Sequence, residues 1–257
     1  MLPDPEAVAD QAARLVLSER RFRPELPLGL ATGRTMIPVY RALVSLVEQL
    51  PEAERQRLRE RWLSFNLDDY VGEPGVQDLP GFRAEMEQAL VRPLGLDPDQ
   101  VRLPWGDAAD PEQEAQRYGA ELQAAGGIGL QLLGLGLNGH VGFNEPPCGP
   151  EEGCRCVQLS ASTRNANAAA FGGESAAVPQ RAITLGLREI LAAGSILLVV
   201  TGAAKAPVLA RLLQEPPSPD LPASWLRGHP RVTLLVDQAA LTPSPLPSDP
   251  HPPPDWR

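Results

Sequence analysis

The chain has 257 residues, of which 43% are hydrophobic and 21% charged, and its formal net charge at pH 7 is −9. This length and apolar content are enough to bury the core of one α/β domain. The acidic balance argues against nucleic acid or an anionic membrane surface as a partner. The sequence has no apolar run of roughly 18 residues that could span a membrane and no signal peptide at its start, so we expect a cytoplasmic protein.

The first elements form a strand–turn–helix unit. Asp4 and Pro5 suit the N-cap and first position of an opening helix. A strand over 26–31 then runs directly into the turn Thr32–Thr35 and a second amphipathic helix. The free N–H groups and the dipole of a helix N-terminus favour an anion, although a plain turn capped by Thr35 is the simpler alternative.

A second strand is predicted over 62–67, and it ends in two adjacent carboxylates, Asp68 and Asp69. Such a pair can bind a metal, cap the next helix or act as a base. A helix over 83–91, a short strand over 101–103 and a helix that ends at 126–127 follow.

The chain is organised around an apolar strand that begins at Ile128 and passes into the glycine-rich segment Leu133–Pro146. The polar residues Asn138, His140 and Glu145 follow closely in this segment. A buried strand that ends by presenting His and Glu is typical of a site at the carboxyl edge of an open α/β sheet. An ordinary surface loop is the alternative.

The segment 146–180 is rich in proline, glycine and short polar residues, so we expect it to be the least regular part of the chain. It holds all three cysteines, Cys148, Cys154 and Cys156. A zinc site normally needs four ligands, and an odd, clustered set does not suggest a disulfide framework. We therefore expect free thiols in a mobile loop and no metal.

Two further strands are predicted over 196–202 and 231–237, with a short helix over 222–228. Lys205 lies in a helix's first turn, where the dipole disfavours a cation, so we expect an anionic partner, although a solvated lysine is the alternative. Residues 242–257 are proline-rich, and we expect them to be disordered. The alternation of strands and helices predicts one α/β domain over 1–241, a Rossmann-like three-layer α/β/α sandwich with a mostly parallel, doubly wound sheet.

The segment Leu133–Pro146 resembles the signature of glucosamine-6-phosphate deaminases, and the resemblance extends with gaps from about Leu28 to Leu241. The related 6-phosphogluconolactonases share the Gly-x-Gly-x-x-Gly-His part but lack Phe-Asn-Glu-Pro. The resemblance implies conversion of glucosamine 6-phosphate to fructose 6-phosphate and ammonia, without an organic cofactor. It implies a phosphosugar as the partner; a monomer or a small homo-oligomer both fit.

The resemblance also implies the roles of individual residues. It makes Asp68 the base that removes the C2 proton, and it gives ring opening to His140, oriented by Glu145 and Asn138. Residues implied to bind the substrate or its phosphate are Thr32, Gly33, Arg34, Thr35, Asp69, Gly136, Arg164 and Lys205.

Two positions depart from the family pattern in the implied phosphate site. Arg34 stands where the family has a glycine, and Ala169 stands where it has a second arginine, on a lid that corresponds here to about 147–180. Because a guanidinium can bind phosphate bidentately, we expect Arg34 to supply the missing charge.

Three other functions fit parts of the pattern. A 6-phosphogluconolactonase or another phosphosugar isomerase would use the same phosphate site, but the residues Phe143, Asn144 and Glu145 favour the deaminase. A non-catalytic sugar-phosphate sensor has no need for Asp68 together with His140, and the helix-turn-helix of sugar-responsive repressors is missing.

Overall fold

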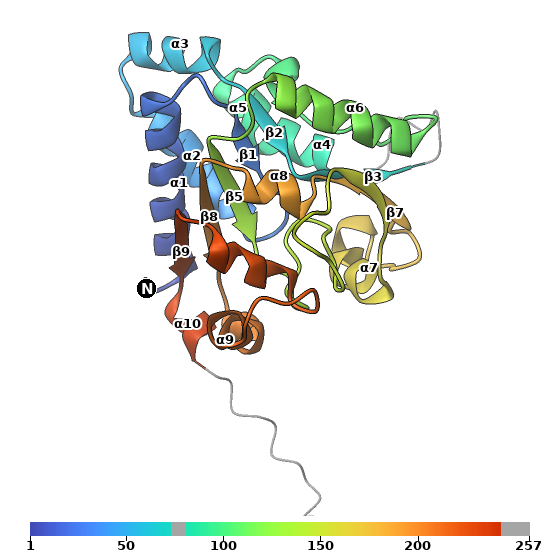
Figure 1. Cartoon of the computed structure of the whole chain (residues 1–257). Helices are drawn as coiled ribbons and strands as arrows, with labels where there is room; N and C mark the ends of the chain where they lie inside the picture. The colour runs from blue at the N-terminus through green and yellow to red at the C-terminus, as the bar shows by residue number, and fades with distance from the viewer. Residues whose placement is uncertain (73–80, 243–257) are drawn as a thin grey trace, which may run out of the picture.

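The structure, a computed structural model, describes residues 1–72 and 81–242 (Figure 1). The predicted proline-rich tail therefore lies, from residue 243 on, outside the described residues.

The core of the molecule is a six-stranded sheet in which each neighbouring pair of strands is parallel. Its order is β4-β2-β1-β5-β8-β9, so the chain builds outward from β1 in one direction and then returns to build from β5 in the other. This is the doubly wound order, and its switch point lies between β1 and β5. The strands are β1 (Leu28–Leu30), β2 (Ser64–Asn66), β4 (Val101–Arg102), β5 (Leu130–Gly134), β8 (Ser195–Val200) and β9 (Val232–Val236).

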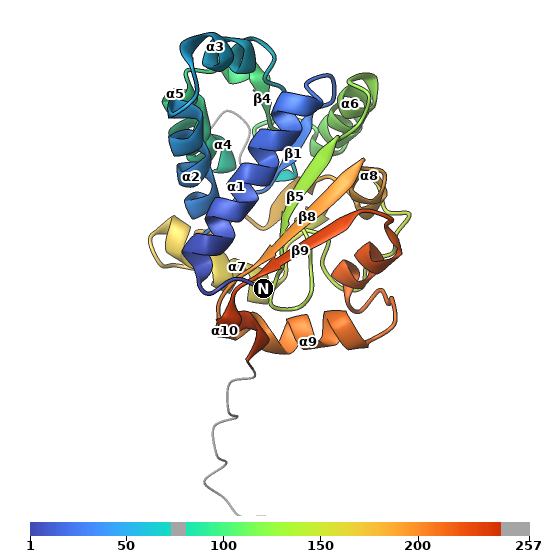
Figure 2. The same ribbon diagram turned by 90° about the vertical axis from the view of Figure 1, so that its left-hand side faces the viewer.

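Helices cover both faces of this sheet (Figures 1 and 2). On one face lie α1 (Pro5–Phe22) and α2 (Met36–Glu48), and on the other lie α6 (Pro111–Ala124) and α8 (Leu187–Leu191). Asp4 caps α1 as predicted, since its carboxylate accepts a hydrogen bond from the Ala7 N–H at 2.8 Å. The predicted three-layer α/β/α fold is confirmed.

The remaining helical segments are short or lie at the sheet's ends. They are α3 (Glu52–Glu60), α4 (Phe82–Met86), η1 (Glu87–Val91), α5 (Arg92–Leu94), η2 (Pro98–Gln100), η4 (Ala203–Lys205), α9 (Ala206–Gln214), η5 (Pro222–Gly228) and α10 (Gln238–Leu241). The predicted helix over 83–91 corresponds to α4 followed by the π-helical turn η1. None of the helices among the described residues is long and apolar enough to cross a membrane.

A second, antiparallel sheet has the order β3-β7-β6, with β3 (Asp68–Val71), β7 (Arg181–Thr184) and β6 (Arg155–Gln158). The chain leaves the large sheet for this small sheet at Leu67, whose N–H donates to the Leu30 carbonyl at 2.8 Å while its carbonyl accepts from the Leu185 N–H at 2.7 Å. Asp68 is therefore the first residue of the small sheet, at the carboxyl edge of the large one.

The segment 146–180, expected to be the least regular of the chain, does contain regular structure. This segment contains β6, the helix α7 (Ala161–Asn167) and a 3₁₀ turn, η3 (Ala168–Phe171). β6 forms because β7 offers it a free backbone edge, not because of its own sequence, which is short and only half-buried. The mobile-loop expectation for the cysteines was wrong: Cys148 is buried and Cys156 lies in β6, although all three are free thiols.

Candidate active site

The loop after β5 folds back on itself at the switch point of the sheet. The Gly136 N–H donates to the His140 carbonyl at 2.9 Å, and the Gly139 N–H donates to the Gly136 carbonyl at 3.1 Å. A β-carbon built on Gly136 would overlap the His140 imidazole. Glycine is therefore required at position 136 because the ring packs directly on the backbone there.

A second glycine fixes the other side of this loop. Gly139 has φ +86°, and a β-carbon there would overlap the Leu221 side chain just before η5. The Ala223 N–H of η5 donates to the Gly139 carbonyl at 2.8 Å. The loop that carries His140 is thus supported from a segment about 80 residues further along the chain.

His140 is a neutral imidazole at physiological pH. Burial lowers its pKa to about 4, the nearby Glu145 carboxylate raises it, and Lys205 lowers it. Its Nδ1 atom is buried and has no hydrogen-bond partner among residues 1–72 and 81–242. The ring can therefore accept a proton at neutral pH, but its own titration lies well below neutral pH.

Asp68 lies against the loop that carries His140. A β-carbon built on Gly142 would lie 3.2 Å from Asp68 Oδ2 and 3.1 Å from Thr184 Oγ1, so glycine leaves room for the carboxylate. Asp68 is only 5% exposed. Burial raises its pKa well above the usual carboxyl value, the Asp69 and Glu85 charges raise it further, and the Phe143 N–H lowers it. A carboxylate of this kind is a stronger base than one in water.

Asp69 is occupied with the backbone rather than free for a ligand. Its Oδ1 accepts from the Tyr70 N–H at 2.9 Å and from the Phe82 N–H at 3.0 Å, which ties the start of α4 to β3. Burial raises its pKa to about 6, against the effect of these hydrogen bonds. Of the two carboxylates, only Asp68 lies against the His140 loop.

Glu145 and Asn138 do not contact the His140 ring by hydrogen bonds. Glu145 accepts from the Ser160 N–H and hydroxyl, both at 3.1 Å, and from the Thr163 hydroxyl, so it ties the loop to the start of α7. Asn138 Oδ1 accepts from the His140 backbone N–H at 3.2 Å. Both residues shape the loop, and the structure does not bring either into the orienting contact that the resemblance implied.

The cationic residues meet at a cavity of about 340 Å³ where β8 and the turn after β1 end. Arg34, Thr35 and Lys205 line it, together with apolar residues of α1 and α2. Burial lowers the pKa of Lys205, and the positive charge of Arg34 lowers it further. Thr35 holds the N-cap position of α2, but its side chain makes no capping hydrogen bond, so the predicted cap is absent and the hydroxyl is free for other contacts.

Asp237 holds the loop that carries Lys205. Both oxygens of this buried carboxylate accept from the Gly202 N–H at 3.0 Å, and Oδ1 also accepts from the Ala240 N–H at 2.8 Å. The buried acceptor fixes the turn that follows β8 without neutralising Lys205.

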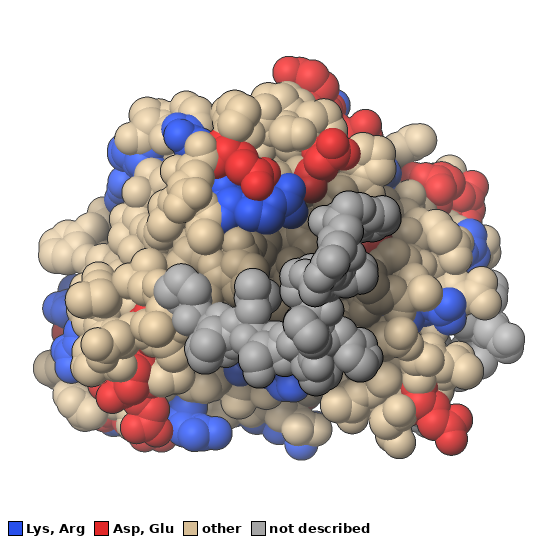
Figure 3. All heavy atoms as spheres, turned by 90° about the horizontal axis from the view of Figure 1, so that it is seen from below, with Lys and Arg blue, Asp and Glu red and all other residues tan. Residues whose placement is uncertain are grey.

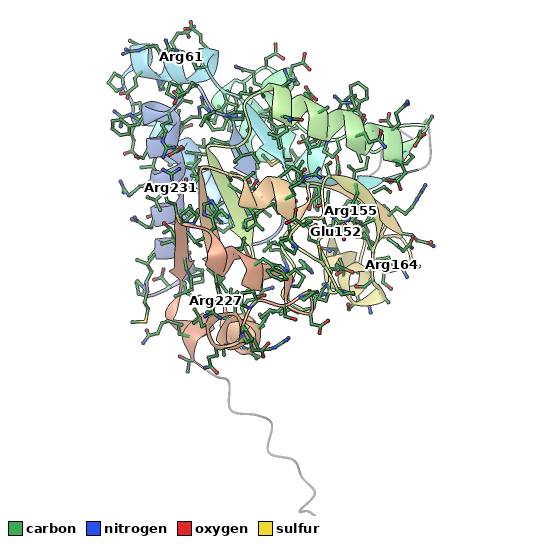
Figure 4. All side chains as sticks on the ribbon, viewed as in Figure 1. Arg61, Glu152, Arg155, Arg164, Arg227 and Arg231 are labelled. Atoms are coloured by element: carbon green, nitrogen blue, oxygen red, sulfur yellow. The ribbon has the colours of Figure 1, made fainter. Side chains whose placement is uncertain are left out.

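Asp68, His140 and Arg164 do not line this cavity. Arg164 is half-buried on α7, below Arg155 in the view of Figure 4. From the side where α9 and α10 lie, basic and acidic side chains alternate over the visible surface rather than forming one basic patch (Figure 3).

Glu85 is a residue of this region that the sequence interpretation missed. Its Oε1 accepts from the Gly33 N–H at 2.8 Å, in the turn that was expected to bind an anion. The local pattern gave no signal for it, because Glu85 is one of several charged residues on an amphipathic segment 52 residues away.

The fold and these residues define a doubly wound α/β protein in which Arg34 and Lys205 line a cavity, while Asp68 packs against the His140 loop that follows β5. The family model for glucosamine-6-phosphate isomerases/6-phosphogluconolactonase matches residues 3–235. The chain belongs to this family.

Individual relatives cover nearly the whole chain. A glucosamine-6-phosphate deaminase of Geobacillus sp. is 40% identical over 238 residues, 92% of each chain, and one of Streptomyces coelicolor is 36% identical over 241 residues, 93% of this chain and 90% of the relative. A solved monomeric glucosamine-6-phosphate deaminase superposes with a TM-score of 0.85 at 34% identity, covering 93% of this chain and 98% of that one. The 6-phosphogluconolactonase of Trypanosoma cruzi has a TM-score of 0.70 at 19% identity, covering 93% and 94%, and thus shares the fold.

The packing of His140 on Gly136 predicts how this ring titrates. In the wild-type chain we expect His140 to titrate at about 4, measured by NMR from the pH dependence of its ring protons and assigned with His140→Gln. Gly136→Ala displaces the ring toward solvent, so the His140 pKa should rise toward its ordinary value of about 6.5. Gly134→Ala is the matched control, since its β-carbon would lie 3.4 Å from Met36 Cε, an ordinary contact. An unchanged His140 pKa in Gly136→Ala would contradict the argument.

Proposed function

We propose that this chain is a deaminase that converts glucosamine 6-phosphate and water to fructose 6-phosphate and ammonia. The observation that carries the proposal is the packing of the Asp68 carboxylate against the loop of His140. Identity of 34–40% to deaminases over more than nine-tenths of the chain supports the same reaction.

In this proposal the phosphate binds at the cationic cavity. Arg34 and Lys205 line it from two different loops, and a dianion between them would relieve their mutual repulsion. Arg164 would approach from α7, within the segment that corresponds to a lid. Two cationic residues, Arg34 and Lys205, therefore line the cavity, and Ala169 adds no further charge.

Ring opening requires a proton to leave the anomeric hydroxyl and another to reach the ring oxygen. A neutral His140 can accept the first proton and return it to the ring oxygen. Its low pKa keeps it in the accepting form across the physiological range.

Asp68 then acts on the open aldehyde. Its carboxylate removes the proton from C2, which gives an enolamine, and delivers that proton to C1. The resulting C2 imine is hydrolysed by water, so that the C2–N bond breaks and ammonia leaves. The raised pKa of Asp68 favours proton abstraction from carbon, because a more basic carboxylate lowers the cost of that step.

The absence of a spanning helix among the described residues and the small size of the substrate agree with action in the cytoplasm. One solved relative is a monomer, which supports a monomer or small assembly here.

The role of Asp68 is tested by Asp68→Asn, which keeps the side chain's shape but removes the base. We expect ammonia release from glucosamine 6-phosphate to fall by about 100- to 10,000-fold, which is the usual contribution of general-base catalysis. Binding of the substrate, measured by calorimetry, should change little. Turnover near the wild-type rate would remove Asp68 as the base.

The acidic side of the pH profile should depend on Asp69. Both Asp68 and His140 must be unprotonated, so kcat/KM falls as the pH drops through the raised pKa of Asp68. Asp69→Asn removes a charge that raises this pKa and keeps an oxygen acceptor for the start of α4. We expect the acidic limb to move to lower pH in this variant. A limb that stays in place would show that Asp68 does not set it.

The contribution of Arg34 is tested by Arg34→Ala, with Arg41→Ala as the control because Arg41 is an exposed arginine of α2. We expect the KM for glucosamine 6-phosphate to rise about 10- to 100-fold in Arg34→Ala, which corresponds to one charge-assisted contact of about 1.5–3 kcal/mol. Arg41→Ala should leave it unchanged. An unchanged KM in both variants would exclude Arg34 from the phosphate site.

A further inference from the structure

Glu85 is a half-buried carboxylate of α4. Unlike Asp68, His140 and Lys205, it does not lie in a segment that follows a strand of the large sheet. Its hydrogen bond from the Gly33 N–H, at 2.8 Å, places it on the turn after β1. A phosphate bound at this N–H would have to displace the Glu85 carboxylate, which occupies the Gly33 N–H directly before the cationic Arg34 in the chain.

The helix α4 that carries Glu85 is fixed to the strand that carries Asp68. The Phe82 N–H at the start of α4 donates to Asp69 Oδ1, and the Phe82 ring packs 4.8 Å from the Tyr70 ring. This attachment does not leave Glu85 free to swing away from the site.

Glu85 therefore lies beside Asp68. Gly33 and Asp68 follow adjacent parallel strands whose last residues, Leu30 and Asn66, are paired. Consistent with this, the Glu85 charge is one of the causes that raise the pKa of Asp68.

Within the part of the chain that the structure describes, no lysine or arginine forms an ion pair with Glu85. Arg83 of the same helix donates instead to the Leu103 carbonyl at 3.3 Å. A half-buried carboxylate beside another carboxylate is unfavourable without a cation. Such local conflicts are expected where a ligand completes the site.

We infer that Glu85 is a specificity residue that binds the ammonium group on C2 of the amino sugar phosphate. The inference rests on the proposed function, which sets C2 beside Asp68 and the phosphate beside Arg34 and Lys205. A primary amine is protonated at neutral pH, whereas glucose 6-phosphate carries an uncharged hydroxyl at C2. The carboxylate of Glu85, held by Gly33, therefore selects the amino sugar by charge.

The test uses two probes that cannot react because C1 is reduced: 2-amino-2-deoxyglucitol 6-phosphate and glucitol 6-phosphate. Calorimetry of the full chain should show that Glu85→Gln weakens binding of the amino probe by about 10- to 100-fold and of the hydroxyl probe by less than about 2-fold. Gln keeps the size of the side chain and an oxygen acceptor for the Gly33 N–H. Glu87→Gln is the control and should leave both affinities unchanged, because Glu87 lies two residues further along the chain and is paired with Arg92 at 2.9 Å.

Equal weakening of both probes would overturn the inference, because Glu85 would then act only by shaping the turn at Gly33. No weakening of either probe would overturn it as well. Glu85→Asp, which keeps the charge, should retain the preference for the amino probe, and loss of that preference would count against the inference if Glu85→Gln folds poorly. Failure of the proposed function is seen separately, as a wild-type chain that releases no ammonia from glucosamine 6-phosphate.

Discussion

The close packing of the His140 ring on the backbone of Gly136 is the constraint on which the site depends. It requires a loop that turns back at once after β5, and the hydrogen bond from Gly136 to the His140 carbonyl closes that turn. The same loop leaves Gly142 against the Asp68 carboxylate. Each glycine thus serves a particular close approach, that of the imidazole at Gly136 and that of the Asp68 carboxylate at Gly142.

Burial acts in opposite directions on His140 and Asp68, which pack on this loop at Gly136 and at Gly142. It lowers the pKa of the His140 imidazole and raises that of the Asp68 carboxyl group, because the charged form is disfavoured in both. The outcome is a neutral imidazole and a more basic carboxylate packed on the same loop, without a hydrogen bond between the ring and Glu145. Glu145 contributes instead by tying α7, and with it Arg164, to the loop.

The large sheet could be predicted from the sequence because its strands are buried apolar runs that alternate with amphipathic helices. The small sheet could not, since β6 is stabilised by the edge of β7 rather than by its own residues. Local motifs likewise indicated Asp68, His140 and Lys205, which directly follow strands. The roles of Asp69 and Glu85 depend on contacts with backbone N–H groups 13 and 52 residues away, which no local pattern records.

The candidate site holds one pair of neighbouring cationic residues and one group of neighbouring carboxylates. Arg34 lies close enough to Lys205 to lower its pKa, and Glu85 and Asp69 raise the pKa of Asp68. Each grouping of like charges costs free energy in the free protein. A neutral ligand relieves neither cost, and a simple anion relieves only one. A ligand that is anionic at one end and cationic at the other relieves both, and an amino sugar phosphate in its open form is of that kind.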